Sequence, residues 1–81
     1  MSSIVTVFGG SGFIGRYLVA KLAKRGYRVR VAVRRPNEAL HLRVTGDVGQ
    51  VEPIQVNIRD EASTQSAIIG SDIVVNLVGI L

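Results

Sequence analysis

The sequence contains no cysteine and a single histidine. Without thiols the chain has neither a disulfide framework nor a thiolate metal site, and one histidine is too few for a zinc centre. No apolar run approaches the roughly 20 residues of a membrane span, and no signal peptide precedes the first predicted strand. We therefore expect no metal, no membrane span and a reducing, cytoplasmic compartment.

Acidic residues are also few, since ten Lys and Arg stand against six Asp and Glu and give a formal net charge of +4. Four of the basic residues lie close together: Arg28, Arg30, Arg34 and Arg35. A basic patch is one mark of a nucleic-acid-binding protein, in which aromatic side chains often accompany the charges. Here valines alternate with the first arginines and no aromatic residue lies between them. The pattern favours a phosphate-bearing cofactor over nucleic acid.

Glycine is concentrated near the start of the chain, at Gly9, Gly10, Gly12 and Gly15. The apolar run 4–8 before these glycines is long enough for one buried strand. After them the apolar period becomes that of a helix, with a predicted buried face made of Ile14, Tyr17, Leu18 and Leu22. A strand, a glycine turn and a helix in this order are the setting in which Gly-x-Gly-x-x-Gly indicates a dinucleotide site.

The chemistry of such a site explains the glycines. A chain that passes from a strand into a helix within a few residues needs backbone angles that a Cβ makes costly. A side chain at Gly12 would hold a pyrophosphate away from the backbone, and one at Gly15 would hold the helix away from the sheet. The helix then begins with unpaired N–H groups that attract phosphate. A Walker A loop is excluded, because Arg16 and Tyr17 follow Gly15 in place of Lys and Ser or Thr.

The rest of the chain alternates helices and strands, predicted as a helix over 13–25, strands over 27–33 and 51–58, a helix over 60–69 and a strand over 72–81. Asn37 could cap a short helix in the poorly periodic stretch 37–47, Pro53 favours an edge strand, and Asp60 is a predicted N-cap. Right-handed crossovers give the strand order 3-2-1-4, the first half of a Rossmann-type, doubly wound α/β sheet. Residues 1–81 thus read as the N-terminal part of one dinucleotide-binding domain. The last strand is predicted to be central and buried on both faces. Because its outer edge is open, we expect the chain to be marginally stable, to self-associate, or to pair this strand with a second chain.

Several stretches together resemble extended and atypical short-chain dehydrogenases/reductases of the NAD-dependent epimerase/dehydratase type. They are Val7–Gly15, Val31–Pro36, Asn57–Asp60 and Asn76–Gly79. Within that superfamily the chain is most similar to bacterial relatives of the nucleotide-binding accessory subunit of respiratory complex I, including at Leu40–Arg43 and Gly46–Gln50. The resemblance implies a bound dinucleotide, respiratory complex subunits as partners and a location peripheral to the inner membrane.

The resemblance also implies roles for individual residues. Gly9, Gly12 and Gly15 match the glycine motif, with Gly10 inside it and with Ser11, Phe13 and Ile14 supplying backbone around the pyrophosphate. Arg34 matches the position that faces the adenosine ribose, and Leu77, Val78 and Gly79 match the end of the fourth strand beside the ribose. Asn57 and Ile58 match a pair that flanks the adenine. The family more often has Asp at the first of these two positions, so Asn57 departs from the pattern.

The end of the second predicted strand distinguishes the two nicotinamide cofactors. NAD sites hold the ribose 2′-hydroxyl with an Asp or Glu about 20 residues past the glycines. Arg34 and Arg35 stand at that spacing, and no acid accompanies them. Because a guanidinium pairs with a 2′-phosphate through two hydrogen bonds, we expect NADP(H) in preference to NAD(H), the alternative being that these arginines are only a solvated strand end.

No catalytic residue can be assigned. Enzymes of this superfamily use a Tyr-x-x-x-Lys pair on a later helix, and Tyr17 and Lys21 match that spacing on the wrong helix. We interpret the match as accidental and predict that Tyr17 packs in the core. Two function classes stay open: a protein that holds NADP(H) in a structural or sensing role, and the cofactor-binding half of an active oxidoreductase or nucleotide-sugar epimerase/dehydratase.

Overall fold

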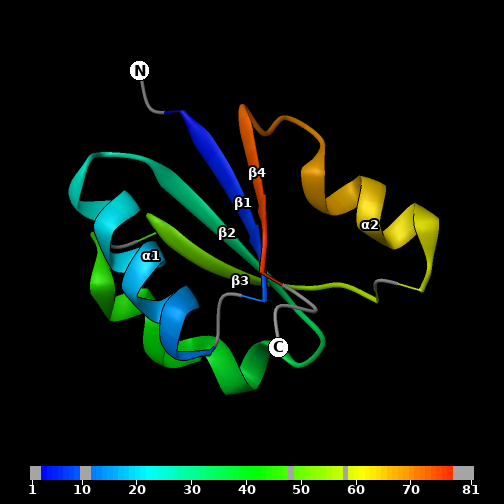
Figure 1. Cartoon of the computed structure of the whole chain (residues 1–81), viewed down its shortest axis with the longest axis horizontal. Coiled ribbons are helices and arrows are strands. Elements are labelled where there is room, and N and C mark those ends of the chain that lie inside the picture. Colours follow the sequence, from blue (N-terminus) through cyan, green and yellow to red (C-terminus); the bar gives the residue numbers. More distant parts are fainter. Residues whose placement is uncertain (1–2, 10–11, 48, 58, 78–81) are drawn as a thin grey trace.

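The structure, a computed structural model, describes residues 3–9, 12–47, 49–57 and 59–77. Four strands and three helices alternate along the chain (Figure 1). In order they are β1 (Ile4–Phe8), α1 (Phe13–Lys24), β2 (Arg28–Val33), the 3-10 helix η1 (Pro36–Thr45), β3 (Val51–Gln55), α2 (Glu61–Ile68) and β4 (Ile73–Asn76). The predicted order of elements is confirmed.

The four strands form one parallel sheet in the order β3-β2-β1-β4. This is the predicted Rossmann-type order. β3 lies at an edge, which suits its Pro53 because proline has no N–H to donate to a neighbouring strand. The register sets one row across the sheet, Ile54, Ala32, Phe8 and Asn76. Since all strands run the same way, the segments that follow this row lie together at the carboxyl edge of the sheet.

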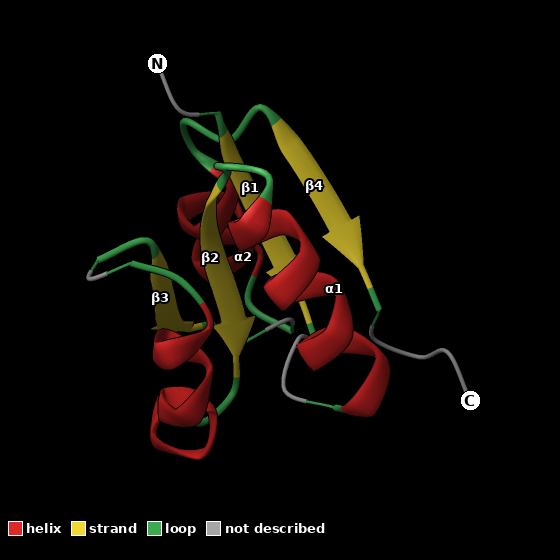
Figure 2. Cartoon of the chain, turned by 90° about the vertical axis from the view of Figure 1, so that its left-hand side faces the viewer, coloured by secondary structure: helices red, strands yellow, loops and turns green. Residues whose placement is uncertain are grey.

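The two faces of the sheet carry separate cores. On one face α1 and η1 pack over valines of β1, β2 and β3, whereas α2 lies on the opposite face (Figures 1 and 2). The second core is small and joins α2 to the sheet through Phe8, Ala32, Val56 and Ala67. The alternation in β2 has the predicted result, because Val29, Val31 and Val33 enter the first core while Arg28 stays exposed.

The buried face of α1 differs from the prediction. Gly15, Val19 and Ala23 face the sheet, and Leu18 and Leu22 flank them. Ile14 and Tyr17 are 63% and 64% exposed, so their predicted place on the buried face is wrong. Because Gly15 and Ala23 are small, the helix can lie close to the sheet on the face that carries them. The larger Ile14 and Tyr17 are then outside the contact face and exposed.

The segment between β2 and β3 is a 3-10 helix rather than a capped α-helix. Its cap is Arg35 and Pro36 occupies the first turn, so the prediction that Asn37 caps it is wrong. Proline suits a first turn because its fixed φ is already helical and its missing N–H would have no partner there. Ala39 and Leu42 are fully buried and join η1 to the first core, while His41 is exposed as expected.

The helix α2 is held by polar contacts at both ends. Asp60 caps it as predicted, its Oδ1 accepting from the Ala62 N–H at 3.1 Å. At the other end Arg30 Nη1 donates to the carbonyl oxygens of Ala67 (3.3 Å) and Ile69. Thr6, a buried polar residue of β1, donates to the same Ala67 carbonyl at 3.1 Å and shares a hydrogen bond with the Ser71 hydroxyl. The sheet thereby fixes the position of α2.

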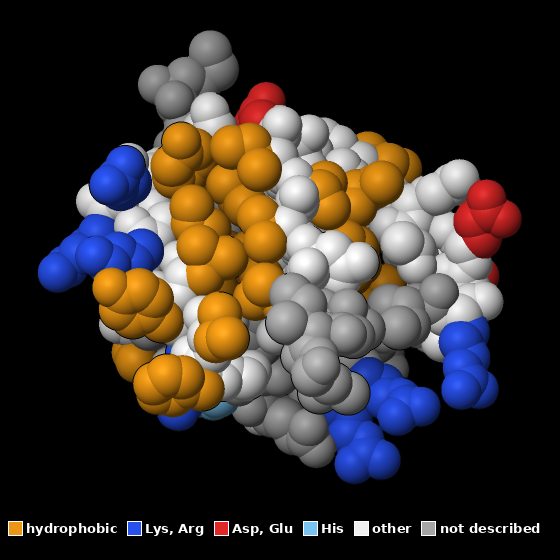
Figure 3. All heavy atoms as spheres, viewed as in Figure 1, with side chains coloured by type: hydrophobic (Ala, Val, Ile, Leu, Met, Phe, Trp, Pro, Cys, Tyr) orange, Lys and Arg blue, Asp and Glu red, His pale blue; other side chains and the backbone are white. Residues whose placement is uncertain are grey.

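Two strands, β3 and β4, are shorter than predicted. β3 ends early because the chain turns at Asn57, whose carbonyl accepts from the Asp60 N–H at 2.9 Å. β4 pairs only with β1 among the described residues, and Ile73 and Val74 on it are 43% and 48% exposed. Within the described part of this strand, the prediction of burial on both faces is wrong. Hydrophobic side chains gather over α1 and β4 on the face seen in Figure 3. The predicted residues from Val78 to Leu81 lie outside the described residues.

Candidate functional site

Four predicted site segments meet at the carboxyl edge of the sheet. Gly9 follows β1, Arg34 follows β2, Asn57 comes two residues after β3 and Leu77 follows β4. Backbone hydrogen bonds hold them in line: the Gly9 N–H donates to the Ala32 carbonyl at 3.3 Å and the Leu77 N–H to the Phe8 carbonyl at 2.9 Å. In open α/β sheets ligands bind at this edge.

A pocket of 240 Å³ lies beside the glycine turn. It is lined by Gly9, Gly12, Phe13, Ile14, Gly15 and Leu77. Gly9 has φ of 79°, a left-handed conformation that residues with a Cβ rarely adopt, so glycine is required here for the turn itself. The structure thus brings together two predicted groups, the glycine motif and the end of the fourth strand.

Gly12 has a different reason to be glycine. Its φ of −78° and ψ of −179° suit any residue, and a Cβ added there would meet no atom within 4 Å. The fold alone therefore does not require glycine at this position, and the open space beside it is available to a ligand. Gly12 is also the N-cap of α1, where no side chain caps the helix and no acid lies in the first turn. Free N–H groups and an open approach fit an anionic pyrophosphate.

A second hollow, of 590 Å³, lies at the ends of β2 and β3. Arg34, Arg35, Pro36, Asn37 and Gln55 line it. Both predicted arginines are exposed and share this hollow, as a basic site for a phosphate requires. The sequence interpretation missed Gln55 and the placement of Asn37. The strand register would have identified Gln55, because it pairs with Val33, the residue directly before Arg34.

Asn57 lines neither hollow. It sits in a tight turn at the carboxyl end of β3, where its Oδ1 accepts from the Arg59 N–H at 3.1 Å. The other predicted site residues, Gly10, Ser11, Ile58, Val78 and Gly79, lie outside the described residues. Their roles stay predictions.

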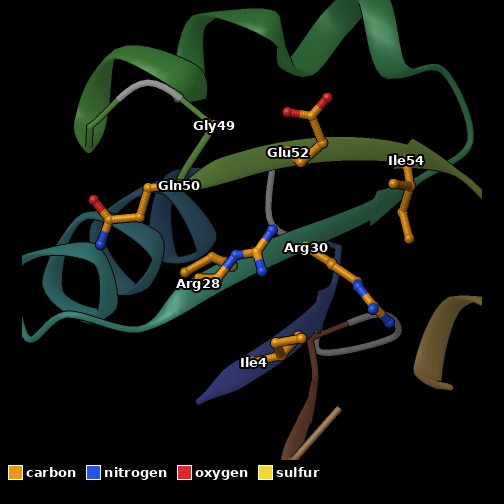
Figure 4. Close-up of a pocket in the computed structure, with 8 residues that line it drawn as sticks. Ile4, Arg28, Arg30, Gly49, Gln50, Glu52 and Ile54 are labelled. Carbon is orange, nitrogen blue, oxygen red and sulfur yellow. The ribbon is translucent and has the colours of Figure 1, made fainter. Parts of the chain in front are cut away.

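A third hollow, of 350 Å³, lies toward the opposite end of the strands (Figure 4). It is lined by Ile4, Arg28, Val29, Arg30, Gly49, Gln50, Glu52 and Ile54. Three of its polar side chains already serve the fold: Gln50 Nε2 donates to the Ala23 carbonyl at 2.7 Å, Glu52 pairs with Arg43 at 2.8 Å, and Arg30 holds α2. This hollow is therefore a poor candidate for the cofactor.

Neither a catalytic pair nor a metal centre emerges from the described residues. Lys21 Nζ lies 5.3 Å from the centre of the Tyr17 ring, and both side chains are exposed on α1. The prediction that Tyr17 packs in the core is wrong, and neither Tyr17 nor Lys21 lines any of the three hollows. Within residues 3–9, 12–47, 49–57 and 59–77, no three His, Cys, Asp or Glu side chains come together as metal ligands. No helix in that part is long and apolar enough to cross a membrane.

The sequence is similar to those of several known proteins. Two relatives are subunit 9 of the NADH dehydrogenase [ubiquinone] 1 alpha subcomplex, mitochondrial, from Arabidopsis thaliana and the mitochondrial NADH-ubiquinone oxidoreductase 40 kDa subunit from Neurospora crassa. The first is 44% identical over 94% of this chain and 19% of its own length, and the second is 42% identical over 91% and 20%. The chain thus spans about a fifth of these relatives.

Solved structures agree on the fold. A short chain dehydrogenase from Bacillus anthracis superposes with a TM-score of 0.80 at 24% identity, covering 91% of this chain and 34% of that one. The F189W actinorhodin polyketide ketoreductase with NADPH gives a TM-score of 0.71 at 26% identity, covering 93% and 32%. The sequence model of the NAD dependent epimerase/dehydratase family matches residues 5–81. With the parallel order β3-β2-β1-β4 and the glycine turn at its carboxyl edge, the chain belongs to the NAD dependent epimerase/dehydratase family.

Proposed function

We propose that the chain binds a nicotinamide dinucleotide along the carboxyl edge of the sheet, with NADP(H) preferred to NAD(H). The observation that carries this proposal is the pairing of two hollows at one edge, one beside the glycine turn and one beside Arg34 and Arg35. A dinucleotide needs both an anion site for its pyrophosphate and a place for its adenosine.

The pyrophosphate lies over the glycine turn in this proposal. Backbone from Gly9 to Gly15, including Gly10, Ser11, Phe13 and Ile14, surrounds it, and the first turn of α1 donates N–H groups. The absent Cβ of Gly12 lets the phosphates approach the backbone. Leu77, with Val78 and Gly79 after it, stands beside the ribose, and Asn57 and Ile58 stand beside the adenine.

The preference for NADP(H) rests on charge at the end of β2. Arg34 follows the last residue of β2 directly, at the position where NAD sites place an acid. Its side chain is exposed and has no ion-pair partner among the described residues. An exposed guanidinium beside a hollow can form two parallel hydrogen bonds to a 2′-phosphate.

We further propose that the cofactor has a structural or sensing role in a respiratory assembly at the inner membrane. This follows the relatives, whose names describe subunits of mitochondrial NADH dehydrogenase [ubiquinone] and of mitochondrial NADH-ubiquinone oxidoreductase. The second candidate, the cofactor-binding part of an active oxidoreductase or nucleotide-sugar epimerase/dehydratase, is favoured by the family and by the likeness to a short chain dehydrogenase. Hydride transfer from bound cofactor to any reducible substrate would favour this second candidate.

Arg34→Ala tests the cofactor preference. Loss of the charge-assisted contact to the 2′-phosphate costs about 1.5–3 kcal/mol, so NADPH affinity should fall roughly tenfold to a hundredfold. NADH affinity should change little, because NADH has no 2′-phosphate. Fluorescence titration of both cofactors measures the two dissociation constants, and Arg25→Ala removes an exposed arginine at the end of α1 as a matched charge control. Equal losses for NADPH and NADH in Arg34→Ala would refute the preference.

A further inference from the structure

The hollow at the amino end of the strands contains one cation that the fold does not use. Arg28, the first residue of β2, is exposed, and its guanidinium makes no hydrogen bond or ion pair with any other described residue. Its neighbour in register on β1 is the apolar Ile4, and Figure 4 shows the two side chains on adjacent strands beside the hollow. Arg28 is therefore an unpaired positive charge in the wall of a hollow.

The acidic side chains near Arg28 are already occupied. Glu52 lies directly opposite Arg30 in the register of β2 and β3, so the two side chains leave neighbouring strands on the same face. They do not pair, because Glu52 binds Arg43 at 2.8 Å and Arg30 donates to the carbonyls at the end of α2. Asp72, before β4, accepts from a backbone N–H of β1 at 2.8 Å and does not line the hollow. The lining side chains thus carry two arginines and one carboxylate that is already paired, which leaves an excess of positive charge.

Two isoleucines give the same hollow an apolar side. Ile4 and Ile54 are half-buried and line the 350 Å³ space together with Arg28. The helix α2 packs against this face of the sheet through Phe8 and Ala32, which lie at the carboxyl ends of β1 and β2. The hollow lies nearer the amino ends and remains open beside α2 (Figure 4). It therefore offers an unpaired cation and apolar contact area together.

We propose that this hollow docks an acidic segment of a partner protein, with a Glu or Asp carboxylate on Arg28 and a neighbouring aliphatic side chain against Ile4 and Ile54. A guanidinium binds a carboxylate through two parallel hydrogen bonds, and arginine is enriched at protein interfaces. That a partner protein exists rests on the proposed function as a subunit of an assembly. Because the hollow lies toward the opposite end of the strands from the glycine turn, a partner here leaves the carboxyl edge open to the dinucleotide.

A peptide of matched chemistry tests the hollow. The probe alternates leucine with glutamate and is capped at both ends, and its counterpart carries glutamine in place of glutamate. Titration of the ¹⁵N-labelled chain with the glutamate peptide should give saturable amide NMR shifts at Arg28, Gln50 and Ile54. The glutamine peptide has nearly the same shape without the charge, so it should bind at least about fivefold more weakly.

Arg28→Met is the matched variant, because methionine keeps an unbranched apolar side chain and removes the charge. It should weaken binding of the glutamate peptide by about fivefold or more and leave binding of the glutamine peptide unchanged. Arg25→Met makes the same change in net charge at an exposed arginine outside the hollow, and it should leave both affinities unchanged. Urea denaturation checks that both variants are folded.

Equal binding of the two peptides, equal effects of Arg25→Met and Arg28→Met, or the absence of a saturable shift would overturn the inference. Inorganic phosphate that produced the same shifts with the same affinity would also overturn it, because a site for small anions does not use the apolar side of the hollow. NADPH titration of the same samples separates this inference from the proposed function. NADPH binding without peptide binding overturns the inference alone, peptide binding without NADPH binding overturns the proposed dinucleotide site, and binding of neither overturns both.

Discussion

The substitution Gly12→Val separates ligand binding from folding more clearly than any other change at this edge. An added Cβ at Gly12 meets no atom within 4 Å, and the φ of −78° suits a β-branched residue. Loss of backbone freedom in the unfolded chain favours the variant, while a non-capping side chain at the N-cap disfavours it. The two effects offset one another, so the free energy of unfolding should change by less than about 1 kcal/mol.

Cofactor affinity should fall steeply in the same variant. The valine side chain occupies the space in which the pyrophosphate approaches the backbone. If only two charge-assisted hydrogen bonds are lost, at about 1.5 kcal/mol or more each, the loss is about 3 kcal/mol. That corresponds to more than a hundredfold in affinity. NADPH titration by fluorescence measures the affinity, and urea denaturation measures the stability.

Gly70→Ala is the opposite control. Gly70 lies beyond α2 with φ of 80°, and an added Cβ would make only an ordinary contact, 3.5 Å from the Arg30 guanidinium. The left-handed backbone should cost about 1–2 kcal/mol of stability, with no effect on the affinity of the folded chain. If Gly12→Val kept its NADPH affinity, or lost stability as Gly70→Ala does, the role assigned to Gly12 would be refuted.

Two further predictions concern the contact between β2 and α2 and the open edge of β4. Arg30→Met should lower the free energy of unfolding, measured in urea, by about 1–2 kcal/mol, because it removes the donors to the Ala67 and Ile69 carbonyls at the end of α2. The control Arg28→Met, on the same strand, should change this free energy little. Equal effects of the two substitutions would contradict the role of Arg30. We also expect the chain to self-associate through the outer edge of β4, as measured by light scattering. Val74→Lys should reduce the association because a charge on an edge strand opposes pairing, whereas Val44→Lys, at an 85% exposed site on η1, should not. A chain that stays monomeric at high concentration would contradict the expectation.

The strand order was predictable because it depends on local patterns and on a general rule of chain geometry. Short valine-rich runs mark the strands, and right-handed crossovers leave one parallel order for them. The ends of α2 were predictable because they depend on local interactions. Asp60 caps the first turn with its side chain, and Gly70 adopts the left-handed backbone that follows the last turn. The glycine turn was recognised because its context, a strand before and a helix after, lies within a few residues.

The features that escaped prediction depend on contacts between distant residues. Whether Tyr17 or Val19 faces the sheet depends on how closely Gly15 lets the helix approach, which apolar spacing alone does not tell. Arg30 belongs to the basic patch noted in the sequence, yet its guanidinium donates to carbonyl oxygens 37 and 39 residues away. In the candidate site, Gln55 joins the arginine hollow through strand register.

The most direct test of dinucleotide binding at the carboxyl edge is a titration of the ¹⁵N-labelled chain with NADPH, followed by its amide NMR signals. We predict saturable shifts that cluster at Gly9, Gly12–Gly15, Arg34 and Leu77, with no shifts in the hollow around Arg28 and Gln50. Absence of any saturable shift, or shifts centred on the Arg28 and Gln50 hollow, would contradict it.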